Sequence, residues 1–211
     1  MQTNISFMQR LLLMFTGLML ISANTKAQWR VGVIGGGDYN AYTKGAHYLT
    51  DFHNEGRWGY TVGAAAQYDF KEWKAAYSRL GIRAEINMTT KNHSTIRQGA
   101  VFEGITKVGM NFFQVPVMVA YSLGSKKVRA IVNLGVYGGV VGKNSAMPSL
   151  RNGDFGGVGG IGAEWNIHKF TLQAEARCYA GMISATKSES KFKTPHYNTT
   201  TTFQIGLFYN L

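Results

Sequence analysis

The chain has 211 residues, of which 45 % are hydrophobic, 13 % aromatic and only 16 % charged. This amount of apolar surface excludes a disordered chain, and the 26 glycines disfavour a helical bundle because glycine is a poor helix former. The single cysteine, Cys178, excludes an internal disulfide framework and a cysteine-rich zinc site. The net charge is +11, and its distribution along the chain decides which partners it favours.

Residues 1–27 have the pattern of a secretory signal peptide. Arg10 precedes an uncharged apolar run from Leu11 to Ile21, and small residues lead to a cleavage site after Ala27. The run is shorter than the ~20 residues that a membrane-spanning helix needs. We therefore predict Sec-type export, removal of residues 1–27, and a single mature domain over 28–211.

Apolar residues then recur at every second position in eight separate segments. In the segment 79–89 the charged residues all fall on one face and the apolar residues on the other, which is typical of a β-strand with two different faces. Each segment has about ten residues or more, roughly twice the length of an ordinary strand. The predicted strands span residues 28–39, 58–70, 79–89, 110–122, 128–141, 154–166, 170–180 and 199–211.

The connections between these strands alternate in length. Long connections at 40–57, 90–109, 142–153 and 182–198 alternate with short ones at 71–76, 123–127 and 167–169. This alternation predicts an up-and-down meander with both ends of the chain on the short-turn side. Pro116 lies within a predicted strand and cannot donate to the sheet, so we expect a bulge or a missing hydrogen bond there.

Periodicity alone leaves open which face is outside. Inward apolar faces would make a lipocalin-like barrel that carries an apolar ligand in the periplasm, whereas outward apolar faces would make an outer-membrane barrel. Aromatic residues gather at both ends of the apolar stripes, as in the girdles of membrane barrels, and this favours the membrane. The predicted girdle residues are Trp29, Trp58, Phe70, Tyr121, Trp165 and Phe170.

The opposite face carries five arginines, six acids and no lysine. Arginine pairs with carboxylates through two parallel hydrogen bonds, so this set predicts a salt-bridge network that fills the lumen. The residues are Arg30, Arg79, Arg83, Arg129 and Arg177, with Asp38, Asp69, Glu85, Asp154, Glu164 and Glu175. No helix candidate remains to cover an open sheet. The predicted fold is all-β, an eight-stranded antiparallel up-and-down transmembrane β-barrel.

With these residues placed, the chain resembles the PorT-like outer-membrane β-barrel family of Bacteroidetes-type envelopes. The resemblance is carried by the stretches Phe113–Val117, Asn133–Gly139 and Asp154–Gly157. It implies an outer-membrane location and, because one branch is linked to type IX secretion, a place in an envelope or secretion complex. The last strand also resembles the signal that the outer-membrane assembly machinery recognises, through Gln204, Gly206, Tyr209 and Leu211.

Other motifs point to chemistry less strongly. Gly157, Gly159 and Gly162 match a dinucleotide fingerprint, but the strand and helix that give it meaning are absent, and glycine here favours close strand packing. His47 and His53 lie in the first long connection and would serve an enzyme that modifies lipids. We predict no catalytic site, no cofactor and no metal.

Basic residues outside the strands are divided between the long connections and the short turns. Nucleic-acid binding would need them on one face, so lipid headgroups and lipopolysaccharide phosphates are the better partners. Cys178 falls on the apolar face and is expected to meet lipid. The sequence therefore favours a structural or interaction protein of the outer membrane, with the periplasmic carrier and the lipid-modifying enzyme as alternatives.

Overall fold

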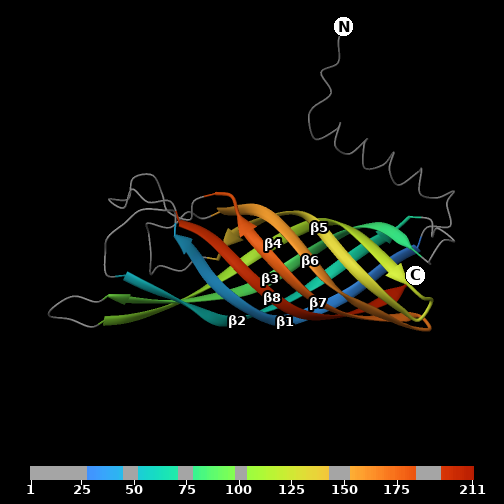
Figure 1. The fold of residues 1–211 in the computed structure, drawn as a ribbon, viewed down its shortest axis with the longest axis horizontal. Coiled ribbons are helices and arrows are strands. Elements are labelled where there is room, and N and C mark those ends of the chain that lie inside the picture. The colour runs from blue at the N-terminus through green and yellow to red at the C-terminus, as the bar shows by residue number, and fades with distance from the viewer. Residues whose placement is uncertain (1–27, 45–51, 71–77, 98–103, 143–152, 184–195) are drawn as a thin grey trace, which may run out of the picture.

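The computed structural model describes residues 28–44, 52–70, 78–97, 104–142, 153–183 and 196–211. The predicted signal segment 1–27 lies outside these residues. Eight antiparallel strands form a closed barrel in which each strand pairs with the next and β8 pairs with β1 (Figure 1). The strands are β1 (Gln28–Lys44), β2 (Phe52–Asp69), β3 (Arg79–Arg97), β4 (Gly104–Gly124), β5 (Val128–Val141), β6 (Gly153–Ile167), β7 (Phe170–Gly181) and β8 (His196–Asn210). The predicted eight-stranded up-and-down order is confirmed.

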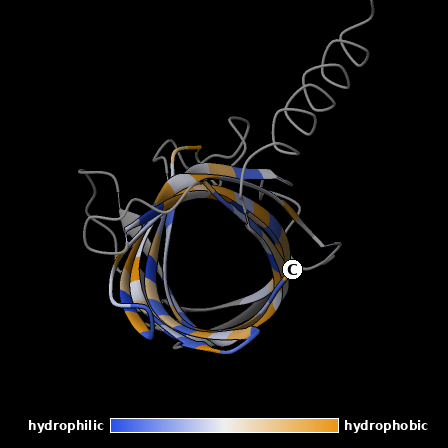
Figure 2. Ribbon diagram, turned by 90° about the vertical axis from the view of Figure 1, so that its right-hand side faces the viewer, coloured by the Kyte–Doolittle hydropathy of each residue, from blue (hydrophilic) through white to orange (hydrophobic). Residues whose placement is uncertain are grey.

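The first and last strands close the barrel. Their register runs from Arg30 opposite Asn210 to Lys44 opposite His196, and Figure 2 shows the complete ring of strands from one end. Closure leaves no sheet edge over this length, so the backbone groups of the wall bond to neighbouring strands. A closed barrel of this kind meets the requirement that a protein in lipid satisfies its backbone polar groups internally.

The apolar faces point outward. Val33 is 63 % exposed and Leu134 is 71 % exposed, although both are aliphatic, whereas Arg30 and Arg177 are buried inside the barrel. A lipocalin-like barrel would have the opposite arrangement, with its apolar side chains in the lumen. The orientation of the faces therefore excludes the periplasmic carrier.

Several strands continue further than the alternating pattern predicts. β1 runs to Lys44, β2 begins at Phe52, β3 runs to Arg97 and β4 begins at Gly104, all within segments that the sequence predicted as long connections. The polar and apolar residues cease to alternate there, so these parts of the strands carry no period of two that would predict them. Pairing of the backbone continues where the sequence signal ends.

Pro116 interrupts the sheet on one side. The register between β3 and β4 passes from Ala84 opposite Val117 to Asn87 opposite Gln114, with no paired partners in between and no shift. Pairing of Pro116 with Tyr137 on β5 continues. The prediction of a missing contact is confirmed, and the alternative prediction of a bulge at Pro116 is wrong.

The short turns hold one end of the barrel together. Ser125 N donates to Val128 O at 2.8 Å, and Asn166 N donates across to Lys127 O at 2.8 Å, which ties two neighbouring turns. His168, at the turn between β6 and β7, has φ of 54°, the left-handed conformation that such hairpin turns require. Within the described ranges, no helix is long and apolar enough to cross a membrane.

Candidate functional site

The charged residues meet inside the barrel because of two regularities of the fold. Alternate residues of each strand point to the same face, so Arg83 and Glu85 of β3 both face inward, as do Glu175 and Arg177 of β7. In the closed order of eight strands, β3 and β7 are four strands apart and lie on opposite sides of the ring. These four residues, the central cluster, therefore face one another across the lumen.

The central cluster is a square of ion pairs. Arg177 donates from Nη1 to Oε2 of Glu85 at 2.8 Å and from Nη2 to Oε1 at 2.9 Å. Arg83 donates from Nη1 to Oε1 of Glu175 at 2.9 Å. Each arginine also pairs with the acid on its own strand: Arg83 Nε lies 2.6 Å from Glu85 Oε1, and Arg177 pairs with Glu175. Two positive and two negative charges thus neutralise one another, with side chains at most 1 % exposed.

Amide side chains complete the coordination of the two central acids. Asn87 donates to Glu85 Oε2 at 3.0 Å. Asn133 of β5 donates to Glu175 Oε1 at 2.8 Å, and Gln204 of β8 donates to Glu175 Oε2 at 3.1 Å. Four strands therefore contribute to the central cluster, and this extends the constraint around the ring.

A second group, the turn-end cluster, lies where the strands enter the short turns. It consists of Arg30, Asp69, Arg79, Arg129 and Glu164. Glu164 accepts from Arg30 Nη1 at 2.9 Å, from Arg79 Nη2 at 2.9 Å and from Arg129 Nη1 at 3.4 Å. Asp69 pairs with Arg30 Nε at 2.8 Å and with Arg79 Nη1 at 3.3 Å. One glutamate thus joins guanidinium groups from β1, β3 and β5.

Gln173 connects the two clusters. Its Oε1 accepts a hydrogen bond from Arg83 Nη1 at 2.7 Å, and its Nε2 donates to Glu164 Oε2 at 3.2 Å. The two clusters and Gln173 together form the charged lumen network. The sequence interpretation missed Gln173, Asn87 and Asn133, although each of them stands at an inward position of its strand. They fall at the same alternate positions of their strands as the charged residues, and this alternation is the signal that would have identified them.

Glycine makes room for this network. Gly162 and Gly160 of β6 stand opposite Glu175 and Arg177 of β7. A Cβ on Gly162 would lie 2.2 Å from the Ala174 carbonyl oxygen and 2.8 Å from Glu175 Cγ. A Cβ on Gly160 would lie 2.6 Å from Arg177 Cγ. The glycine-rich segment is thus a strand, and the absence of side chains at Gly160 and Gly162 leaves space for Arg177 and Glu175 of β7. The segment has no helix at whose N-terminus a dinucleotide phosphate could bind.

The lumen also contains apolar side chains that the sequence interpretation did not anticipate. Phe208 is fully buried between Ile34 and Ala65, and the guanidinium carbon of Arg83 lies 4.7 Å from the centre of its ring. A second cluster groups side chains from four consecutive strands: Met118, Tyr137, Val158 and Tyr179. These residues occupy inward positions, where polar residues otherwise predominate, so their packing depends on the shape of the closed barrel.

The remaining two acids of the inner face lie toward the opposite end of the barrel. Asp38 accepts a hydrogen bond from Thr61 Oγ1 at 2.7 Å. Asp154 accepts one from the Tyr137 hydroxyl at 3.2 Å and one from Asn198 Nδ2 at 3.0 Å. Both carboxyl groups are thus held by hydroxyl and amide donors near the long connections.

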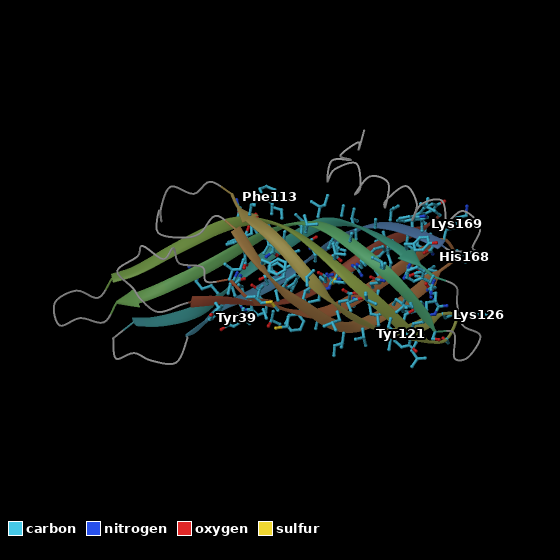
Figure 3. The ribbon with its side chains drawn as sticks, turned by 90° about the horizontal axis from the view of Figure 1, so that it is seen from above. Tyr39, Phe113, Tyr121, Lys126, His168 and Lys169 are labelled. Carbon is cyan, nitrogen blue, oxygen red and sulfur yellow. The ribbon has the colours of Figure 1, made fainter. Side chains whose placement is uncertain are left out.

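The six predicted girdle residues are all on the outer surface, with exposures from 36 % for Trp29 to 62 % for Trp58. Figure 3 shows Tyr121 near the turn end and Tyr39 and Phe113 toward the other end. Tyr39 and Trp58 pack edge to face, with ring centroids 5.6 Å apart. Exposed aromatic residues therefore stand at both ends of the outward apolar surface.

The residues of the last strand divide between the two faces. Gln204 and Gly206 are inside, whereas Tyr209 and Leu211 are outside. Gln204 contacts the charged lumen network, so part of the predicted assembly signal also belongs to the interior.

The remaining candidates of the sequence are Cys178 and the two histidines of the first long connection. Cys178 is exposed on the outer face. His53 lies in β2 opposite Ile96 of β3, and His47 lies outside the described residues. Within the described part of the chain, no three histidine, cysteine or acidic side chains are arranged to hold a metal ion.

Comparison with known proteins agrees with this architecture. Residues 13–210 match the family model of the outer membrane protein beta-barrel domain. The outer membrane protein OprG from Pseudomonas aeruginosa has a similar fold, with a TM-score of 0.53 and 7 % identity, over 89 % of this chain and 97 % of that one. No curated protein sequence matches the chain.

Two further solved structures align with TM-scores below 0.5. The attachment invasion locus protein Ail of Yersinia pestis, in complex with a heparin analogue, aligns with a TM-score of 0.43 and 14 % identity, over 86 % of this chain and 99 % of that one. The outer membrane protease OmpT from Escherichia coli aligns with a TM-score of 0.39 and 9 % identity, over 88 % of this chain and 96 % of that one. The family match, which covers most of the sequence, assigns the chain: it belongs to the outer membrane protein beta-barrel domain family and is located in the outer membrane.

Proposed function

We propose that this protein is a non-enzymatic structural or interaction protein whose lumen is closed to solutes and which acts through its outer surface. The observation that carries the proposal is the central cluster, which joins β3 to β7 across the barrel through Arg177 with Glu85 and Arg83 with Glu175. An eight-stranded barrel has an interior just wide enough to be filled by side chains. A pore or a carrier function would need that space.

The energetics favour a permanent closure. A solute that passed along the axis would have to separate buried charges from their partners, and breaking a buried ion pair on one side is strongly unfavourable. The turn-end cluster adds a second layer, in which Glu164 alone joins three arginines. Gln173 links the layers, so displacement of one disturbs the other.

Conductance of the refolded protein in a planar lipid bilayer tests the closure. We expect no current above that of the lipid alone, and steady single-channel steps from the native protein would show the proposal to be wrong. The double variant Glu85→Ala with Arg177→Ala removes one positive and one negative charge together, and we expect it to admit ions. Heat-modifiable mobility on gels confirms that each sample is folded before it is measured.

Export and assembly complete the proposal. Cleavage after Ala27 would leave Gln28 as the first residue, and intact-mass measurement of protein from outer membranes tests this. Gln204, Gly206, Tyr209 and Leu211 would present the last strand to the assembly machinery. Lipid and lipopolysaccharide headgroups would contact the basic turns and loops.

The resemblance to the PorT-like family suggests a subunit of an envelope or secretion complex. Crosslinking in cells, followed by identification of the captured proteins, tests that assignment. If the barrel is folded and exposed at the surface and still captures no envelope protein, the assignment is wrong.

A further inference from the structure

The rim of the barrel at the end of the long connections is uneven. The last pair between β4 and β5 on this side is Phe112 with Val141. Three strands end or begin close to this level: β5 ends at Val141, β6 begins at Gly153 and β7 ends at Gly181. Pairing between β3 and β4 continues from Thr90 opposite Asn111 to Arg97 opposite Gly104. These pairs add about 25 Å of sheet at ~3.4 Å per residue. Figure 1 shows this hairpin projecting beyond the rest of the barrel.

The projecting part is a three-stranded extension of the barrel wall. The pairing of β1 with β2 ends at Asn40 opposite Arg57, and the further residues of β1 pair with β8. β2 meanwhile pairs with β3 from Gly56 to Phe52. We call the resulting three-stranded unit, residues 52–56, 90–97 and 104–111, the outer sheet. Among the described strands, none pairs with the β4 side of the outer sheet that faces away from β3.

The direction of the backbone groups on that side follows from one hydrogen bond. Gly142 N donates to the Asn111 carbonyl oxygen at 2.7 Å, so the polar groups of Asn111 point away from β3. In an antiparallel strand these groups alternate from one residue to the next between the two sides. Gly109, Lys107 and Ile105 therefore present their amide and carbonyl groups on the same outer side, and none of them is a proline.

We infer that the β4 edge of the outer sheet, Gly104–Met110, binds an extended acidic segment of another protein by adding it as a further strand. Strand addition is an established mode of recognition in which backbone hydrogen bonds supply the affinity. The inference rests on the proposed function, because a barrel with a closed lumen acts through its surface. It specifies both the part of that surface and the kind of partner.

The charge of the outer sheet indicates an acidic partner. Lys91, Arg97 and Lys107 carry positive charge, and Glu55 is the acid among these residues. The outer sheet also begins where the outward aromatic residues Tyr39 and Phe113 end, at the long-connection side of the apolar surface (Figure 3). Trp58 stands opposite Tyr39 in the register of β1 and β2. A positively charged strand edge suits an acidic polypeptide better than a lipid chain.

Peptide binding to the full-length mature barrel in lipid nanodiscs tests this inference. The probe is a fluorescent acidic peptide of alternating pattern, Thr-Glu-Val-Glu-Thr-Glu-Val, whose anisotropy reports binding. The same peptide with a central proline cannot form a continuous strand and serves as the control. We expect the native barrel to bind the first peptide and to bind the proline peptide at least about tenfold more weakly, as the loss of one or two hydrogen bonds implies.

Two variants at one position distinguish the effect of losing a backbone hydrogen-bond donor from the effect of changing the side chain. Gly109→Pro removes the outward amide donor while leaving the bonds to β3, and we expect it to weaken peptide binding by about tenfold. Gly109→Ala keeps the donor, and we expect native binding. Ile105→Pro provides a second edge variant if Gly109→Pro does not fold, as judged by gel mobility.

Four results would overturn the inference: no binding by the native barrel, equal binding by the proline variants, equal binding of the two peptides, or a native dimer that Gly109→Pro dissociates. The last would show that a second copy of the chain occupies the edge. Each of these results leaves the conductance measurement unaffected, so a failure here is distinct from a failure of the closed-lumen proposal.

Discussion

The guanidinium of Arg177 binds both carboxylate oxygens of Glu85 across the barrel, at 2.8 and 2.9 Å, although the two residues are 92 positions apart in the sequence. Glu85 and Arg177 are both 1 % exposed. A bidentate pair is directional, so it holds β3 and β7 at one distance and one register. It links two strands that share no backbone hydrogen bond, because they lie on opposite sides of the ring.

Removal of Arg177 should destabilise the barrel strongly. Arg177→Ala leaves Glu85 buried without its bidentate partner, and we expect a loss of about 3–5 kcal/mol in the free energy of unfolding. Urea titration of the protein folded in lipid vesicles, followed by tryptophan fluorescence, measures this loss. The paired variant Glu85→Leu with Arg177→Met removes both charges and should lose much less. A larger loss in the paired variant than in the single one would contradict the role given to the ion pair.

The inward glycines of β6 should not tolerate a side chain. We expect Gly162→Ala to cost about 1–3 kcal/mol of unfolding free energy, because its Cβ would lie 2.2 Å from the Ala174 carbonyl oxygen. Gly159 provides a control on the same strand, since its Cβ would come no closer than 3.6 Å, to Leu134 Cδ1. The urea midpoints of the two variants give the comparison. Equal midpoints would refute the argument that β6 needs glycine where it faces Glu175.

The terminal strand should act in assembly through its outward residues. We expect Tyr209→Ala to slow insertion by reconstituted assembly machinery, because the proposed signal loses its aromatic residue. Phe203→Ala changes another outward aromatic residue of the same strand and should leave the rate unchanged. The heat-modifiable fraction on gels, followed over time, measures both rates. An equal delay in the two variants would assign the effect to general loss of apolar surface.

The inward residue Gln204 should affect stability instead of assembly. Its Nε2 donates to Glu175 Oε2 at 3.1 Å, so Gln204→Ala leaves a buried carboxylate oxygen without one of its donors. We expect a loss of about 1–3 kcal/mol in unfolding free energy and a normal insertion rate. Slow insertion with an unchanged urea midpoint would place Gln204 in the signal alone.

The aromatic residues at the two ends of the barrel should lie at the two membrane interfaces. Variants that keep Trp29, Trp58 or Trp165 as the only tryptophan allow each to be probed separately. Because tryptophan prefers the headgroup level, we expect all three to be quenched more by lipids brominated near the headgroup than by lipids brominated near the chain end. Preferential quenching by the deep bromines would mean that the apolar surface is positioned differently in the bilayer.

The sequence by itself determined the wall of this protein. A period of two over eight segments, with charges on one face, follows directly from the alternation of side chains in a strand, and it predicted the number, order and faces of the strands. The inward arginines and acids were also predictable, because a charge on a lipid-facing stripe is costly. The alternation of residues along one strand depends only on what each face of that strand meets, so it can be interpreted without knowing which distant strands lie opposite.

The tertiary structure alone decided which charges meet. Whether Arg177 pairs with Glu85 or with another acid depends on the stagger of the strands when β1 closes on β8, and this is a property of the whole ring. The burial of Phe208 under Arg83 and the use of Gln173 as a link depend on the same geometry. The outer sheet was not predicted for a different reason: its backbone pairing continues through segments whose polar and apolar residues do not alternate, and pairing by itself leaves no pattern of side chains in the sequence.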